Sequence, residues 1–162
     1  MSERLRQDAP IGATATTGGT EYLSFGLGEN EYSVDIMSVR EIRGWTRTTS
    51  LPHAPSYVRG VINLRGSVLP VIDLAMRLGL PATEPEDRNV IIVVDADTRS
   101  MGLRVDAVSD ILTLTDDQMH PPPDVATSPG ARFVQALTIM DDKMVRILDL
   151  SLVMPSSSEI SP

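Results

Sequence analysis

The sequence predicts a mainly β protein built from two similar lobes, and three observations support this fold class. Most apolar runs are short, rich in Val, Ile and Leu, and bounded by Gly, Pro, Asn or Asp, which is typical of small antiparallel sheets and barrels. The sequence between residues 20 and 154 is similar to itself, as expected for an internal repeat. Helix is expected only in short pieces. At 162 residues, the chain can form one domain, or two small units that share a core.

The internal repeat appears in two registers. The first register, which places Phe25 on Val94, aligns a strand, a polar turn, a second strand and the pattern V-x-[ED]-I. It also pairs Tyr32 with Met101, Val34 with Leu103, Val39 with Val108, Glu41 with Asp110, and Ile42 with Ile111. The second register aligns "VLPVIDL" (68–74) with "MVRILDL" (144–150).

The offset between matched residue numbers is larger in the second register than in the first. The second copy of the repeat therefore contains extra residues. The extra residues fall in the proline-rich "TDDQMHPPPDVATSPG", whose prolines exclude regular structure. We expect one β-barrel lobe from each copy, at about 21–80 and 89–154. An apolar interface between them is also expected, because one copy alone would bury too little surface.

The remaining elements follow in chain order. Residues 1–19 are rich in Ser, Thr, Gly and Ala and have too little apolar content to pack, so we expect a disordered tail. After the first two strands and the segment "VREIRGW", the stretch "PSYVR" (55–59) predicts a short helix. Asp73 and Asp149 can each cap a further short helix. The polar residues 155–162 predict a second disordered tail.

The strand "VREIRGW" (39–45) has mixed faces. Alternation places one set of side chains on one face and a second set on the other. Val39, Glu41 and Arg43 lie on one face, and Arg40, Ile42 and Gly44 lie on the other. Because neither face is uniformly apolar, an apolar side chain such as that of Ile42 can lie in an exposed groove. The alternative, that Ile42 and its repeat partner Ile111 are ordinary core residues, stays open at this point.

The stretch "GVINLRGSVLPVIDL" (60–74) predicts a hairpin with an arginine at its tip. Residues 61–64 and 67–69 form the two strands, and Arg65 with Gly66 forms a two-residue turn, in which glycine can adopt a positive φ. Pro70 cannot donate to a ladder, which places the return strand at an edge or a bulge. Arg65 is then displayed rather than paired with a carboxylate inside the protein. The residues alone do not decide between a solvated turn residue and a recognition group.

The composition excludes several classes of function. A net charge of −8 argues against nucleic acid as a partner, because the phosphates would repel such a surface. The longest apolar run, "VIIVV" (90–94), is far shorter than a membrane span, and the first residues do not resemble a secretory signal. We therefore expect a cytoplasmic protein without direct membrane insertion. The lack of cysteine excludes disulfides, thiol nucleophiles and cysteine-ligated metals.

No motif in the sequence indicates catalysis or a metal site. His53 and His120 lie in different copies and lack the spacing of metal ligands. Ser67 is not part of a G-x-S-x-G elbow, and "GLGENE" lacks the third glycine of a dinucleotide-binding loop. We expect a protein that is not an enzyme and binds no metal or cofactor.

Three segments, in this order and spacing, resemble the CheW-like domain family of bacterial chemotaxis. They are "YSVDIMSVREIRG", "VRGVINLRGSVLPVIDL" and "GLRVDAVSDILTL", and "NLRG-x-V-x-P-x-x-DL" is a specific match. The resemblance runs from about Glu21 to Met154, so that residues 20–154 are expected to form the domain. The same domain ends chemotaxis histidine kinases and begins CheV-type proteins. Those proteins are longer and carry further domains, so a stand-alone copy resembles the coupling-protein members of the family.

The resemblance implies a fold and a function. The family fold is two pseudo-symmetric, five-stranded SH3-like barrels packed around a third, inter-lobe apolar core. Its coupling proteins are non-catalytic scaffolds without a cofactor. They bind the cytoplasmic tips of methyl-accepting chemotaxis receptors and the regulatory domain of the histidine kinase CheA, and are thereby recruited to membrane receptor arrays. A coupling protein of a related chemosensory pathway, controlling pili or another output, and a small β-barrel hydrolase or ligand-binding protein are the alternatives.

The resemblance also implies two sets of contact residues. The receptor groove would lie between the lobes, lined by Val39, Glu41, Ile42, Asn63, Arg65 and Ile111. The first kinase contact would lie around Trp45, Arg59 and Gly60, and a second, ring-closing contact around His120 and Val125. The family often has an arginine and an aromatic residue at this second place, so the sequence departs from the family pattern there.

Overall fold

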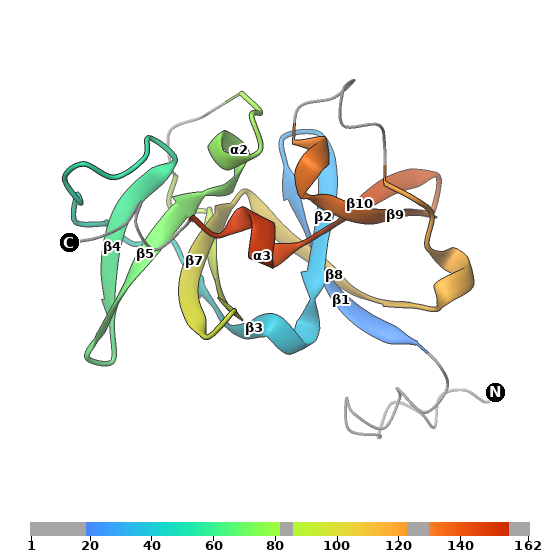
Figure 1. The fold of residues 1–162 in the computed structure, drawn as a ribbon, viewed down its shortest axis with the longest axis horizontal. Coiled ribbons are helices and arrows are strands. Elements are labelled where there is room, and N and C mark those ends of the chain that lie inside the picture. The colour runs from blue at the N-terminus through green and yellow to red at the C-terminus, as the bar shows by residue number, and fades with distance from the viewer. Residues whose placement is uncertain (1–18, 82–85, 123–129, 156–162) are drawn as a thin grey trace.

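The computed structural model describes residues 19–81, 86–122 and 130–155, which form ten strands and a few short helices (Figure 1). The prediction of a mainly β fold is confirmed. The strands are β1 (Thr20–Leu27), β2 (Asn30–Asp35), β3 (Val39–Gly44), β4 (Val58–Leu64), β5 (Ser67–Asp73), β6 (Val90–Ala96), β7 (Arg99–Val105), β8 (Ala107–Leu114), β9 (Val134–Met140) and β10 (Lys143–Leu148). The helices are α2 (Leu74–Arg77), α3 (Leu150–Val153) and the 3-10 turns η3 (Ile36–Ser38), η4 (Asp116–Gln118) and η5 (Ala131–Phe133).

The strands form two five-stranded sheets with the same pattern of connections. One sheet has the order β8-β1-β2-β10-β9, and we call it lobe 1; the other has the order β3-β6-β7-β5-β4, and we call it lobe 2. In each lobe, the segment after one edge strand forms an isolated bridge to the opposite edge strand. The bridges are Thr49 with Val61 in lobe 2 and His120 with Leu137 in lobe 1. These bridges curl each sheet toward a closed barrel.

The lobes differ from the two copies of the sequence repeat. Strands β1 to β5 belong to the first copy and β6 to β10 to the second, yet each lobe takes two strands from one copy and three from the other. The copies are joined by the antiparallel pairs β1–β8 and β3–β6 and the parallel pairs β2–β10 and β5–β7. The expectation of one lobe per copy is corrected in this respect. A repeat shows that two segments have similar environments, but it does not show which segment each pairs with.

Three apolar clusters fill the protein, one inside each lobe and one between the lobes. The cluster inside lobe 2 contains Ile62, Leu69 and Ile91, and the cluster inside lobe 1 contains Tyr22 and Ile147. The largest cluster joins both sheets and the short helices. It includes Leu23, Phe25, Tyr32 and Val34 of lobe 1, Ile72, Ile92 and Leu103 of lobe 2, and Leu74 and Val153 of the helices. The predicted inter-lobe core is confirmed.

The predicted hairpin around Arg65 is confirmed. Leu64 pairs with Ser67, and Arg65 and Gly66 have φ values of 53° and 87°, as in a type I′ turn. The expected edge position of the return strand is wrong, because β5 has neighbours on both sides, but the pairing of β5 with β7 begins only at Val71, after Pro70. The proline nitrogen is therefore tolerated because no ladder has begun on that side.

Two of the three predicted short helices are present. Asp73 accepts a hydrogen bond from the backbone N–H of Met76 at the start of α2, and Asp149 accepts one from Ser151 at the start of α3. The helix predicted at 55–59 is wrong, because Val58 donates to Pro55 in a turn and already belongs to β4. The tails, up to residue 18 and from residue 156, lie outside the described residues.

The exchange of strands leads to a prediction about separate copies. Neither residues 19–81 nor residues 86–155 contain all the strands of a lobe. Each fragment expressed alone should give a poorly dispersed NMR spectrum and no cooperative melt, whereas the two mixed should form a folded complex. A cooperative thermal transition in either isolated fragment would show that one copy is a folding unit.

Candidate functional site

The side chain of Arg65 reaches from the β4–β5 turn to β3 and pairs with Glu41. The Arg65 side chain is 65% exposed, and the Glu41 side chain is 26% exposed. Arg43 donates to the other carboxylate oxygen of Glu41 at 3.4 Å. Asn63 holds the turn, since its side-chain oxygen accepts from the N–H of Gly66 at 3.0 Å. Arg65 is thus both displayed and paired, and the carboxylate that it meets lies at the surface rather than inside the protein.

The two arginines change the acidity of Glu41. The hydrogen bond from Arg65 is the main cause that holds the pKa of the Glu41 carboxyl below its ordinary value, with a smaller contribution from Arg43. An opposite charge and a donated hydrogen bond both favour the ionised form. Glu41 is therefore an anion throughout the neutral range and keeps the guanidinium of Arg65 oriented along β3.

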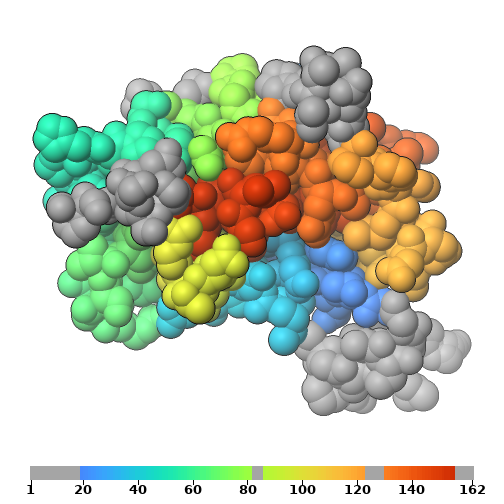
Figure 2. Space-filling view, viewed as in Figure 1, coloured from blue at the N-terminus to red at the C-terminus, as the bar shows by residue number. Residues whose placement is uncertain are grey.

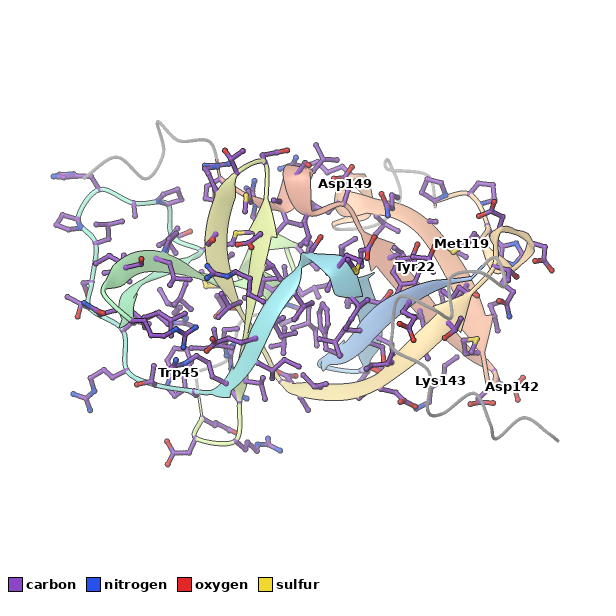
Figure 3. All side chains as sticks on the ribbon, turned by 90° about the horizontal axis from the view of Figure 1, so that it is seen from below. Tyr22, Trp45, Met119, Asp142, Lys143 and Asp149 are labelled. Carbon is purple, nitrogen blue, oxygen red and sulfur yellow. The ribbon has the colours of Figure 1, made fainter. Side chains whose placement is uncertain are left out.

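Ile42 and Ile111 are both exposed, at 47% and 48% of their surface. The alternative of ordinary core residues therefore does not hold for either. Ile42 lies on β3 at the edge of lobe 2, and Ile111 lies on β8 at the edge of lobe 1. Figure 1 places β3, β1 and β8 along the lower side of the molecule, and Figure 3, seen from below, shows them across this face. Val39 is half-buried against the inter-lobe core.

The charges at the two edges differ. Asp110, the repeat partner of Glu41, accepts from the N–H of Ile111 at 2.8 Å. In the second register of the repeat, Arg65 aligns with Asp141, so the lobe 1 hairpin carries an acid where the lobe 2 hairpin carries the arginine. Glu41 and Arg65 carry opposite charges, whereas the matching residues of lobe 1, Asp110 and Asp141, are both acids. These two positions of lobe 1 therefore cannot form an equivalent ion pair.

A buried ionic network lies beneath the candidate kinase contact. The carboxylate of Asp73 is 0% exposed, and its Oδ2 accepts from Nε and NH2 of Arg59 at 2.9 and 2.6 Å and from NH1 of Arg104 at 3.2 Å. Arg104 also donates to the side-chain oxygen of Asn89 at 3.2 and 2.7 Å. The backbone oxygen of Asn89 accepts from the N–H of Trp45 at 3.0 Å. The network therefore fixes both Arg59 and the start of the segment after β3.

Gly60 acts through its backbone. It is buried and has a φ of +145°, and a Cβ at this position would lie 2.3 Å from the backbone oxygen of Thr49. Thr49 and Val61 exchange two backbone hydrogen bonds, at 2.9 and 2.8 Å, directly beside it. Gly60 therefore shapes the end of lobe 2 and does not present a side chain.

The remaining predicted residues lie at different places. Trp45 packs half-buried against the interior of lobe 2, toward the left of Figure 3. His120 is exposed and exchanges backbone hydrogen bonds with Leu137 at 2.8 and 3.1 Å. Val125 lies outside the described residues. Within the part of the chain that the structure describes, no three His, Cys, Asp or Glu side chains converge in a way that could hold a metal ion.

Sequence reasoning missed the network around Asp73. It identified Asp73 only as a helix cap, and it did not single out Arg104 and Asn89. One signal was available, because Arg104 in "MGLRVDAV" is a lone arginine in an apolar strand, as Arg65 is in its hairpin. Arg104 is 2% exposed, so, unlike Arg65, it is paired inside the protein.

A substitution at Gly60 should lower stability. Gly60→Ala should lower the free energy of unfolding by about 1 to 3 kcal/mol, because a side chain is strained at this φ and collides with Thr49. Gly44→Ala is the matched control, since nothing lies within 4 Å of its added Cβ. Urea unfolding of both variants decides. Equal stabilities would mean that the end of lobe 2 adapts to a side chain at position 60.

The acidity of Glu41 gives a second prediction. Its pKa is lowered in the folded protein, so the interaction with Arg65 is complete above the ordinary pKa of a glutamate and is lost as the pH falls through the lowered value. In an NMR titration of the Glu41 carboxyl, Arg65→Ala should raise the midpoint. Arg40→Ala should leave it unchanged, because Arg40 pairs with Asp95 instead. An unchanged midpoint in Arg65→Ala would contradict the assigned cause.

Comparisons with known proteins agree on one family. A family model described as "CheW-like domain" matches residues 21–158. A chemotaxis protein CheW of Rhizobium meliloti (strain 1021) is 50% identical over 141 residues, which cover 87% of this chain and 91% of that protein. The chemotaxis protein CheW of Klebsiella aerogenes is 35% identical over 140 residues, covering 86% of this chain and 84% of that protein.

A solved structure is similar over most of the chain. The crystal structure of the scaffolding protein TtCheW from Thermoanaerobacter tengcongensis superimposes with a TM-score of 0.80 and 32% identity, covering 88% of this chain and 97% of that one. None of the helices in the described part of the chain has the length and apolar character needed to cross a bilayer.

Proposed function

The chain belongs to the family of CheW-like domains, and we propose that it is a non-catalytic adaptor that couples methyl-accepting chemotaxis receptors to the histidine kinase CheA. The observation that carries the proposal is the exposure of Ile42 and Ile111, two large apolar side chains at matched positions on the edge strands of the two lobes. Exposed apolar side chains with a polar rim are typical of surfaces that bind other proteins.

The receptor contact is proposed on the face of β3 and β8. A receptor tip is a helical hairpin, and an amphipathic helix needs apolar anchors and a polar rim. Ile42, Ile111 and the half-buried Val39 supply the anchors. The planar fork of Arg65 can donate to a receptor carboxylate or to carbonyls at a helix end, while Glu41 keeps it oriented and Asn63 holds its turn.

The kinase contact is proposed at the end of lobe 2, around Trp45, Arg59 and Gly60. Arg59 is three-quarters covered, so its role there depends on the carboxylate of Asp73 that holds it. A second contact is proposed at His120 and Val125 in the second copy of the repeat. With the receptor and the kinase at different places on one chain, the adaptor brings both partners into one assembly.

The proposal also concerns the location of the protein and the ligands that it does not bind. The protein is expected in the cytoplasm, recruited to membrane receptor arrays, without a cofactor and without bound nucleic acid. The same contacts would serve a related chemosensory pathway that controls pili or another output, since the biochemistry is the same. A small ligand-binding or hydrolytic β protein is the alternative from another class.

A reconstituted phosphorylation assay tests the proposal. Receptor signalling fragments, the kinase and this protein are mixed, and autophosphorylation of the kinase is measured with and without the protein. Kinase activity should respond to the receptor only when the protein is present. If the response is the same without it, the protein is not the coupling component.

Variants of the exposed isoleucines localise the receptor contact. Ile111→Asp should weaken receptor binding by about tenfold or more, because it places a charge where an apolar anchor meets its partner. Its melting temperature should stay within a few degrees of the wild type, because Ile111 is about half exposed. Ile139→Asp is the matched control: Ile139 is 60% exposed on lobe 1 but lies outside the proposed contact. Equal receptor binding by the two variants would remove Ile111 from the contact.

A further inference from the structure

Arg77, at the end of α2, joins four segments of the chain through one guanidinium group. Its central carbon lies 4.4 Å from the ring centroid of Tyr57 and 5.0 Å from that of Phe133. Its Nε donates to the backbone oxygen of Val153 at 2.8 Å, and its NH2 donates to that of Leu152 at 3.2 Å. The two rings come from different lobes, and the two oxygens belong to α3.

On the lobe 2 side, Arg77 contacts the segment that leads to the proposed kinase contact. Tyr57 directly precedes β4, and Arg59 and Gly60 are the second and third residues of that strand. The backbone oxygen of Tyr57 accepts from the N–H of Asp73 at 2.7 Å, next to the carboxylate that holds Arg59. The residue whose ring Arg77 contacts is therefore bonded through its backbone to the residue that holds Arg59.

On the lobe 1 side, Arg77 contacts the residue that directly precedes β9. Phe133 is 2% exposed, and its backbone oxygen accepts from the N–H of Asp149 at 2.8 Å. Strand β9 follows directly, and its Leu137 holds the backbone of His120. A shift of Phe133 would therefore shift the strand that carries the proposed second kinase contact.

The same region shows how the two lobes meet. In the space-filling view, α3 lies in red at the centre, between the green and yellow atoms of lobe 2 and the orange atoms of lobe 1 (Figure 2). Arg77 donates to the carbonyls of this helix and stacks on a ring from each side. We infer that Arg77 is a positioning residue that couples the Arg59 end of lobe 2 to the His120 strand of lobe 1, so that both are held in the geometry that the kinase regulatory domain binds.

The inference rests on the proposed function for its biological meaning, but its first test uses the free protein and does not depend on that function. In the free protein, Arg77→Met should shift the amide NMR signals of Arg59 and Gly60 and also those of residues 134–137. The signals of Ile42 and Ile111 should stay in place. Arg132→Met is the matched control, because the exposed Arg132 stacks on the same Phe133 ring, 4.0 Å from its centroid, but from within η5 itself. Its changes should stay on the Phe133 side.

The binding test uses the isolated kinase regulatory domain and, separately, a receptor signalling fragment. Arg77→Met should weaken kinase binding by about tenfold, because the Arg59 end of lobe 2 and the His120 strand of lobe 1 are then no longer held in one geometry. Binding of the receptor fragment should change by less than about twofold. Arg77→Lys should recover part of the kinase affinity, because lysine keeps the charge but not the planar fork. Arg132→Met should leave receptor binding unchanged and should weaken kinase binding less than Arg77→Met does, because it leaves the contacts of Arg77 with Tyr57 and α3 in place.

A double-mutant cycle tests whether Arg77 acts through its contact with Tyr57 rather than through a general loss of folding. Tyr57→Leu removes one stacked ring and leaves both hydrogen bonds of Arg77 to α3. If the two residues act together, Tyr57→Leu combined with Arg77→Met should weaken kinase binding by less than the product of the two single effects. Equal losses for kinase and receptor, or unmoved amide signals at Arg59 and at residues 134–137, would overturn the inference. Failure of the wild type to bind the kinase would instead overturn the proposed function, and the amide signals would still decide whether Arg77 couples the two ends.

Discussion

The carboxylate of Asp73 sets the constraint on which the rest of the structure depends. It is fully buried, and an isolated buried charge would cost several kcal/mol, so the fold has to bring cations to it. Arg59 comes from the adjacent strand of the same repeat copy, and Arg104 comes from the other copy. The same side chain caps α2 through the N–H of Met76 and so fixes the helix that carries Arg77. One buried acid thus ties the exchanged strands together and places the groups at the end of lobe 2.

The two lobes have the same strand order but different chemistry. Asp149, which matches Asp73 in the second register of the repeat, also caps a helix, α3, but through the N–H two residues on rather than three. In the first register, however, Arg104 matches Asp35, so the arginine that completes the network in lobe 2 is an acid in lobe 1. The ion pair of Arg65 with Glu41 is likewise confined to lobe 2 at these positions. A duplicated scaffold therefore presents two unlike surfaces, which suits a protein proposed to hold two different partners.

Exposed and buried arginines have distinct roles in this chain. Arg65 is mostly exposed, so its pairing with Glu41 orients a group at the surface and adds little to stability. Arg104 is buried, and its bonds to Asp73 and Asn89 satisfy groups that water cannot reach. Arg77 lies between these cases, stacked between rings and bound to backbone oxygens. The surroundings of each guanidinium, rather than the residue type, decide whether it serves recognition, folding or the relation between the lobes.

The sequence by itself determined the local structure: the short strands, the Arg65–Gly66 turn, the caps at Asp73 and Asp149 and the exposure of Arg65 all follow from neighbouring residues. The repeat also indicated an apolar interface and the matched positions of Ile42 and Ile111. Only the tertiary structure decided that the copies exchange strands and that Asp73 meets an arginine of the other copy. It also decided that Gly60 is needed for its backbone and that Arg77 stacks between two lobes. These features depend on which strand edges pair and on close packing between distant segments. Alternation and turn chemistry set the faces and ends of a strand, but they do not select its partner.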